Sequence, residues 1–130
     1  MRYIKFRAWD EDRNKMIYDF LDEIESVEYV LSTTDENILY CGNHRDNGDW
    51  QEPKLMQFTG LKDKNGIDIY EGDILLCKTI MGKIIEAQVI FDIEHCSYTL
   101  KTYGDKQLQF PITAFVKEYE VIGNIYENKK

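Results

Sequence analysis

Short stretches of alternating side chains, separated by turn-forming residues, constrain the fold of this chain most strongly. Residues 3–9, YIKFRAW, place successive side chains on two faces with the period of two that is typical of a strand. Residues 10–14 are turn formers, and residues 15–20 resume the strand pattern, so the sequence predicts an N-terminal β-hairpin. Nine tyrosines and six phenylalanines also favour strands. We therefore expect a mainly β fold.

The C-terminal half predicts a further run of strands. The expected strands are residues 74–80, 83–92, 96–103 and 120–126. Met81-Gly82 and residues 93–95 separate the first three strands as turns, and Gly123-Asn124 is an expected kink. Pro111 begins a short element that ends at Phe115, and a helix is one possible conformation for it. Short strands with frequent turns indicate a small barrel or a sandwich.

Residues 19–36 fit two patterns. Phe20, Ile24, Val27 and Leu31 have the spacing of one helix face. Val27 and Leu31 also alternate with Tyr29 between them, as in a strand. The neighbouring segments favour a strand, and a helix remains the alternative.

Acidic residues dominate the charge of the chain, with 24 acids against 16 bases and a net charge of −8. Such a surface repels phosphate, which disfavours a general role in duplex binding. No lysine or arginine occurs between Lys15 and Arg45. The carboxylates of that interval are Asp19, Asp22, Glu23, Glu25, Glu28, Asp35 and Glu36. A solvated face is the ordinary explanation, and a docking patch for a basic partner, centred on Asp22, Glu25 and Glu28, is the alternative.

Three cysteines, Cys41, Cys77 and Cys96, form an odd and irregularly spaced set. That pattern is not a secreted disulfide framework, and free thiols in a reducing compartment explain it most simply. The first residues enter a strand pattern without the apolar stretch of a signal peptide, and no apolar run approaches the length of a membrane span. We expect a cytoplasmic protein without membrane contact.

Metal binding and catalysis have weak signals. Cys41 and His44 are three residues apart and His95 adjoins Cys96, but adjacent His-Cys is an unusual zinc spacing. Surface histidines and small buried thiols explain these residues more simply. No Gly-x-Ser-x-Gly motif or Gly-rich phosphate loop occurs, and acidic pairs are inevitable among 24 carboxylates. We therefore expect no metal, no cofactor and no enzyme activity.

Three segments together resemble the YopX family of phage and prophage proteins. They are residues 4–10 followed by Lys15-Met16, residues 56–74, and residues 120–128. The resemblance spans the chain and departs most at residues 19–54. It implies a phage or prophage setting and an irregular β architecture with an SH3-like small barrel in the C-terminal part. It carries neither an established activity nor catalytic residues.

We expect a single domain over residues 1–130. Its N-terminal β region, with the variable acidic insert, covers residues 1–54, and its barrel-like body covers residues 55–130. The central segment, residues 56–74, is rich in residues that form turns and satisfy backbone amides, which favours a structural role. The alternative is a rigid loop that displays Arg7, Trp9, Gln57 and Asp73 to a partner.

The leading functional hypothesis is an accessory protein that binds a host or phage protein. A nucleic-acid-binding module is a second hypothesis, because small barrels often bind single strands, although the charge balance disfavours it. An enzyme is the third.

Apolar residues near the C-terminus, such as Phe110, Ile112 and Phe115, also predict a homo-oligomer that covers a sheet edge.

Replacing Asp22, Glu25 and Glu28 with glutamine distinguishes the two explanations of the acidic stretch. We expect a solvated face, for which the free energy of unfolding changes by less than about 0.5 kcal/mol, because surface substitutions have small effects. If the stretch is a docking patch, the variant should associate with its partner more slowly, and its association rate should depend less on salt. Urea unfolding and binding kinetics measure the two quantities. Slower association at low ionic strength would contradict our expectation.

Overall fold

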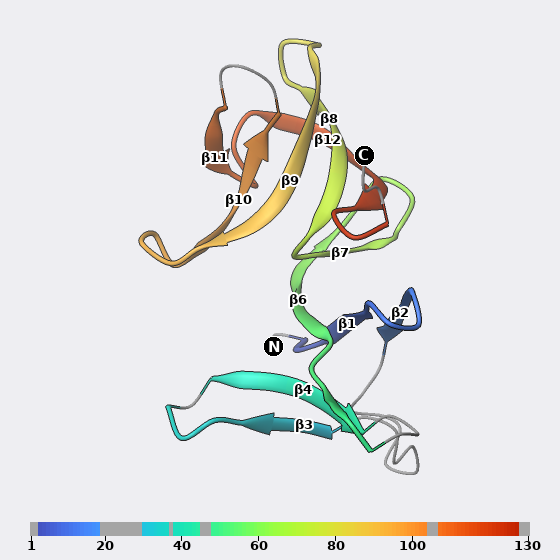
Figure 1. Ribbon diagram of the computed structural model, residues 1–130. Coiled ribbons are helices and arrows are strands. Elements are labelled where there is room, and N and C mark those ends of the chain that lie inside the picture. The colour runs from blue at the N-terminus through green and yellow to red at the C-terminus, as the bar shows by residue number, and fades with distance from the viewer. Residues whose placement is uncertain (1–2, 19–29, 37, 45–47, 104–106, 128–130) are drawn as a thin grey trace. The chain divides into compact units, whose positions relative to one another are not determined.

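Antiparallel strands make up the regular structure of this protein (Figure 1). The structure, a computed structural model, describes residues 3–18, 30–36, 38–44, 48–103 and 107–127. Within these ranges the chain contains no helix, and so none that is long and apolar enough to cross a membrane. The mainly β fold that the sequence predicts is confirmed.

Twelve strands occur in the described residues. They are β1 (Phe6–Asp10), β2 (Lys15–Tyr18), β3 (Val30–Thr33), β4 (Leu39–His44), β5 (Trp50–Gln51), β6 (Lys54–Lys62), β7 (Asp68–Tyr70), β8 (Asp73–Thr79), β9 (Ile84–Asp92), β10 (Ser97–Thr102), β11 (Gln109–Pro111) and β12 (Val116–Asn124). They form sheets with the strand orders β2-β1-β6-β7, β3-β4-β5 and β11-β10-β9-β8-β12.

The chain divides into two compact units. Ile4–Gln57 forms the N-terminal unit, and Phe58–Lys130 together with Met1–Tyr3 forms the C-terminal unit. The strand β6 runs through the division, so its first residues pair with β1 and its last residues pair with β7. The sequence places the start of the barrel-like body at residue 55, and its organisation as a single domain stays a prediction.

The N-terminal unit contains the predicted hairpin, formed by β1 and β2. Asp10 pairs with Lys15 at its end, and Asn14 takes a left-handed backbone with φ of 52° in the turn. The Asp10 carboxylate accepts a hydrogen bond from the Arg13 amide at 3.2 Å. The strand β1 lies between β2 and β6, which buries Ala8 within the sheet. Both faces of β1 are covered, since Arg7, Ala8, Trp9 and Asp10 are all buried.

A second hairpin, β3–β4, begins within the acidic stretch: residues 30–33 form β3, and Asp35 and Glu36 lie in the hairpin turn. Its turn closes where the Thr34 amide donates to the Ile38 carbonyl at 2.9 Å. Residues 19–29 lie outside the described residues, so the choice between strand and helix stays open there. The strand β4 continues to His44 because it pairs with β5. Gly42 allows this, since a Cβ there would lie 1.9 Å from the Trp50 ring.

The five-stranded sheet of the C-terminal unit curls around the main core (Figure 1). The strands β8 to β11 follow one another across the sheet, and β12 returns to pair with β8. Alternate residues of β8, β9 and β10 face inward because strand side chains alternate. The buried cluster is Ile69, Leu75, Cys77, Ala87, Val89, Leu100 and Ile112. The result is a half-barrel with β11 and β12 at its edges.

Two predictions at the C-terminal end need correction. The segment from Pro111 to Phe115 is a turn and not a helix, and the Ala114 amide donates to the Pro111 carbonyl at 2.9 Å. The last strand begins at Val116 instead of at residue 120, because pairing with β8 extends it. Its register shifts twice along β8, and the second shift, between Val121 and Gly123, lies at the predicted kink.

The Asp63 carboxylate connects the β6–β7 turn to β12. One of its oxygens accepts hydrogen bonds from the amides of Asn65 and Ile67 at 2.8 and 2.9 Å. The other oxygen accepts from the Val121 amide at 3.0 Å, and the Lys64 amide donates to the Tyr119 carbonyl at 3.0 Å. Burial alone would raise the pKa of Asp63, but the three amide donors outweigh it and lower the pKa below its usual value.

Asp63→Asn should lower the free energy of unfolding at pH 7 by about 2 kcal/mol, because hydrogen bonds to a charged acceptor are lost. A carboxyl whose pKa is lowered in the folded state stabilises above its unfolded pKa, and this stabilisation disappears as the pH falls through the folded pKa. The difference between the two proteins should therefore shrink below about pH 4. Urea unfolding from pH 7 to pH 3 measures it.

Glu120→Gln is the control for this experiment. It removes the ion pair with Lys64, whose N–O distance is 3.5 Å and whose two side chains are partly exposed. Such a surface pair contributes at most about 1 kcal/mol. Two results would contradict the anchoring role of Asp63. One is an equal loss of unfolding free energy in the two variants, and the other is a loss in Asp63→Asn that does not change with pH.

Candidate functional site

The residues that the sequence proposes for partner display lie mostly inside the protein. Arg7, Trp9 and Asp73 are 4%, 3% and 1% exposed. Gln57 is half-buried on β6. Arg7, Trp9 and Gln57 belong to the N-terminal unit and Asp73 to the C-terminal unit. The acidic candidates Asp22, Glu25 and Glu28 lie outside the described residues.

The central segment satisfies backbone groups where the chain changes direction. The Asp73 carboxylate accepts a hydrogen bond from the Tyr70 amide at 2.8 Å, across the turn that contains Gly72. The Thr59 hydroxyl donates to the Ile69 carbonyl at 2.7 Å and accepts from the Leu61 amide at 3.1 Å. With Asp63, these contacts support the structural explanation of the segment over the display of its side chains to a partner.

A group of three side chains at the β9–β10 turn has the composition of a metal site. Ligand atoms of Asp92, Glu94 and His95 lie within 4.8 Å of one another. His95 and Asp92 already form a hydrogen bond at 2.7 Å, which is the main cause that lowers the pKa of Asp92. The neighbouring Cys96 thiol donates to the Ile93 carbonyl at 3.6 Å. These contacts account for the group as a stabilised turn.

Cys77 and Cys96 are free thiols, as the sequence predicts, and the Cys41 side chain lies outside the described part of the chain. Burial raises the pKa of Cys77 to about 11. A thiol with a raised pKa is a poor nucleophile at neutral pH. Cys77 is therefore suited to packing in the core and not to covalent chemistry.

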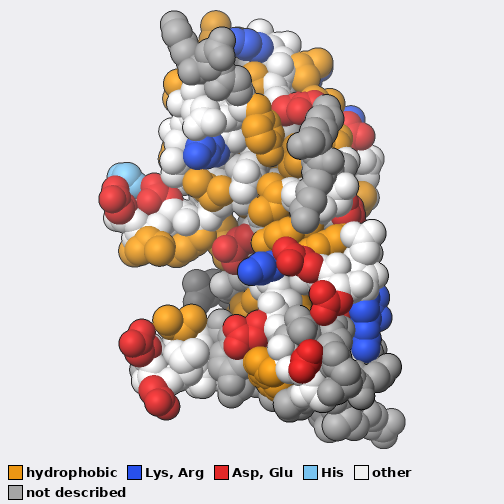
Figure 2. Space-filling view, viewed as in Figure 1, with side chains coloured by type: hydrophobic (Ala, Val, Ile, Leu, Met, Phe, Trp, Pro, Cys, Tyr) orange, Lys and Arg blue, Asp and Glu red, His pale blue; other side chains and the backbone are white. Residues whose placement is uncertain are grey.

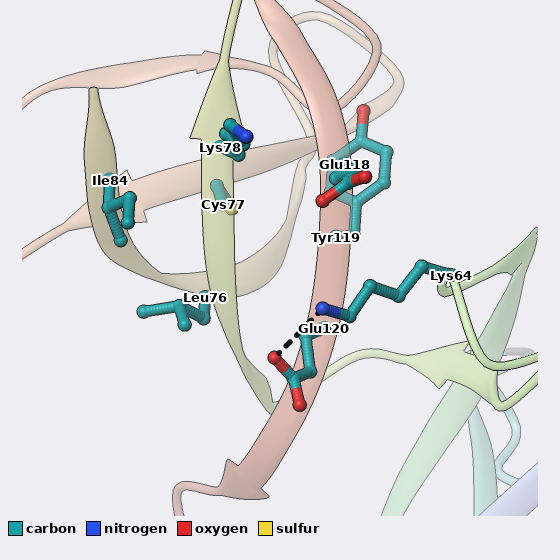
Figure 3. A pocket seen from close by; sticks show the side chains of 8 residues that line it. All are labelled: Lys64, Leu76, Cys77, Lys78, Ile84, Glu118, Tyr119 and Glu120. Carbon is teal, nitrogen blue, oxygen red and sulfur yellow. Dashed lines mark ion pairs between the residues drawn. The ribbon is translucent and has the colours of Figure 1, made fainter. Parts of the chain in front are cut away.

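A shallow pocket of about 190 Å³ lies over β8, β9 and β12 (Figure 3). We call it the side pocket. Its lining residues are Lys64, Leu76, Cys77, Lys78, Ile84, Glu118, Tyr119 and Glu120. Figure 3 shows Lys64 reaching across β12 to its ion-pair partner Glu120. The volume is below the roughly 300 Å³ at which cofactor and ligand pockets begin, so the side pocket suits a single side chain.

Beside the side pocket, four large apolar side chains stand in solvent at one end of the half-barrel. We call Ile80, Met81, Ile84 and Phe115 the apolar tip; they are 68%, 91%, 62% and 67% exposed. The Ile80 amide donates to the Phe115 carbonyl at 2.9 Å, and Ile84 pairs with Lys78 across β8 and β9. The hydrogen bond and the strand pairing therefore bring residues from two separate segments together at the same end of the sheet.

The β8–β9 turn has unusual chemistry for its geometry. The Gly82 amide donates to the Thr79 carbonyl at 2.9 Å, and Gly82 has a φ of 83°, so it supplies the left-handed position of a short loop. Ile80 and Met81 occupy the exposed positions before it. Glycine, proline, asparagine, aspartate and serine dominate such positions because they favour turns. Neither turn geometry nor burial accounts for two aliphatic residues here.

Phe115 also holds a conformation that costs stability. Its φ of 64° is left-handed, which disfavours an L-residue by roughly 1–2 kcal/mol. The ring regains little by burial because most of it is exposed. Strained residues of this kind persist where the surrounding structure holds them and are concentrated at functional sites.

Lysines accompany the apolar tip. Lys78, Lys83 and Lys117 lie within residues 74–85 and 107–117, two stretches that contain no aspartate or glutamate. Figure 2 shows blue and orange side chains together at the top, where Figure 1 places the β8–β9 turn. Glu118 faces Lys78 across the β8–β12 pair, so the excess positive charge comes from Lys83 and Lys117.

Sequence reasoning identified Met81-Gly82 as a turn but did not identify the apolar tip. The available signal was the pair of aliphatic residues, Ile80 and Met81, in front of a turn glycine. No sequence pattern places Phe115 beside them, because pairing between β8 and β12 creates that contact.

Two crystal structures have a similar fold. One is a protein of Enterococcus faecalis, with a TM-score of 0.55 and 23% identity over 98% of this chain and 96% of that chain. The other is protein yopX of Bacillus subtilis, with a TM-score of 0.57 and 16% identity over 95% of this chain and 94% of that chain. These likenesses show the fold alone.

A comparison with curated protein sequences gives no match. The sequence model of the YopX protein family matches residues 5–130, which is nearly the whole chain. The resemblance carried by the opening, central and closing segments is therefore confirmed. This chain belongs to the YopX protein family.

Proposed function

We propose that this chain is an accessory protein encoded by a phage or prophage, and that it acts in the cytoplasm of the bacterial host by binding a host or phage protein. The observation that carries the binding role is the apolar tip. Isolated apolar residues are common on protein surfaces, whereas several grouped together mark interaction sites. Here the Ile80 amide donates to the Phe115 carbonyl, and Met81 follows Ile80 in the same turn. The two aliphatic residues are unusual in a turn, and Phe115 has a left-handed backbone.

Binding accounts for these features better than catalysis does. Exposed methionine and isoleucine are apolar contact residues, and methionine adapts its shape to different partners. The buried Cys77 thiol, with its pKa of about 11, offers no activated nucleophile. The free thiols Cys77 and Cys96 agree with a reducing compartment. A second copy of this chain is one partner that the hypothesis allows.

The test compares partners captured by the full chain and by Met81→Gln/Phe115→Asn. We expect host or phage proteins that the original chain retains and that the double variant loses, because the variant removes apolar contact area. Pull-down with quantitative mass spectrometry measures the loss. Light scattering on both proteins shows whether the partner is a second copy.

Ile93→Gln is the matched control, because Ile93 is 81% exposed in a different hairpin turn, between β9 and β10. It should retain every partner of the original chain. Captured proteins that are identical for the original chain and the double variant would overturn the role of the apolar tip. Equal losses in the double variant and in Ile93→Gln would show nonspecific adhesion and would also overturn it.

Phe115→Asn should leave the free energy of unfolding unchanged or raise it by up to about 1 kcal/mol. Asparagine tolerates the left-handed backbone better than phenylalanine does. Urea unfolding of the single variant measures the change. A loss larger than about 1 kcal/mol would show that the ring supports the fold. The strain at Phe115 would then have a structural cause.

A further inference from the structure

We infer that the apolar tip and the side pocket together bind an acidic segment of a protein partner, in which carboxylates flank apolar side chains. This inference rests on the proposed function and adds the chemistry of the partner. The chain as a whole has a net charge of −8, so a basic partner would be the default expectation. Around the apolar tip and the side pocket, by contrast, Lys64, Lys78, Lys83 and Lys117 outnumber Glu118 and Glu120.

The charge at the apolar tip follows from two stretches of the chain that meet there. Residues 74–85 and 107–117 contain three lysines and no acid, and β8 pairs with β12 so that Thr79 faces Val116. Lys83 lies in the β8–β9 turn, and Lys117 lies at the register shift between Val116 and Glu118. Charges at the rim of an apolar contact mainly determine which partners associate and how fast. An acidic segment is the complement of this rim.

The apolar groups favour a protein over a nucleic acid. Single strands bind through bases stacked on aromatic rings, and Phe115 is the one ring of the apolar tip. The other three members are aliphatic, and they have no π-face to offer a base. An overall charge of −8 also repels a polyanion more strongly than it repels a short acidic segment.

The side pocket continues this surface. Ile84 and Lys78 line the side pocket and also belong to the apolar tip or to its rim. Ile84 and Leu76 provide an apolar wall, while Lys64 and Glu120 form an ion pair beside it. A volume of about 190 Å³ accommodates one apolar side chain of the partner as an anchor. The partner segment would extend from this anchor to Met81.

The experiment selects binders from a random peptide library displayed on phage, with the full-length protein as bait. Parallel selections use Met81→Gln/Phe115→Asn and Lys83→Gln/Lys117→Gln. Some peptides should bind the original chain better than Met81→Gln/Phe115→Asn, and we expect these to combine aspartate or glutamate with aliphatic or aromatic residues. Lys83→Gln/Lys117→Gln should bind the best of these peptides at least about fivefold more weakly than the original chain does. Added salt should weaken their binding to the original chain.

Two control variants separate specific from general effects. Ile93→Gln and Lys54→Gln change an exposed aliphatic residue and an exposed lysine elsewhere, and both should bind the selected peptides as the original chain does. If peptides selected by the original chain bind all variants equally, the proposed role of the apolar tip and this inference both fail.

Other outcomes affect this inference alone. Peptides that need Met81 and Phe115 but are neutral or basic, with no salt dependence, would leave the proposed function standing and overturn the acidic partner. A labelled single-stranded oligothymidylate that binds through the same residues, in the absence of enriched acidic peptides, would replace the protein partner with a nucleic acid.

Discussion

The three hydrogen bonds accepted by the Asp63 carboxylate are the constraint on which the C-terminal unit depends. Two of them close the β6–β7 turn, and the third holds the Val121 amide of β12. Because β12 is an edge strand, an anchor on its outer side also limits unwanted pairing there. The position of β12 along β8 then brings Phe115 to the β8–β9 turn, where its carbonyl accepts from Ile80. A polar contact in a turn thus determines where an apolar surface forms.

In the C-terminal unit, two carboxylates are buried while two large aliphatic side chains are exposed. Asp63 and Asp73 are buried, and hydrogen bonds offset the cost of removing their charges from water. Asp63 accepts three backbone amides, and Asp73 accepts the Tyr70 amide. Ile80 and Met81 are exposed in a turn, where they contribute no core packing. The buried carboxylates stabilise the fold. The exposed Ile80 and Met81 do not, which is why we propose that binding occurs at the apolar tip and not at the central segment.

Family membership and surface chemistry inform different parts of the conclusion. The match over residues 5–130 assigns the chain to the YopX family, and the two crystal structures show its fold. Neither identifies a partner. Our proposal of an acidic partner segment rests instead on an apolar surface with lysines at its rim, on a chain whose net charge is −8. If the proposal holds, the lysines at the rim direct an acidic segment to this surface, because a chain with a net charge of −8 otherwise repels it.

The sequence by itself determined the class of the fold, the N-terminal hairpin and most of the strands after residue 73. Alternation and turn residues act over a few positions, so Gly72 and Gly82 mark bends without reference to the rest of the chain. It also determined the capping role of the central segment, because aspartate and threonine side chains reach amides nearby in sequence. Only the tertiary structure decided that Asp63 reaches Val121, that β12 begins at Val116, and that Phe115 lies beside Ile80. These contacts join residues far apart in the chain, and local periodicity contains no information about which distant strands pair.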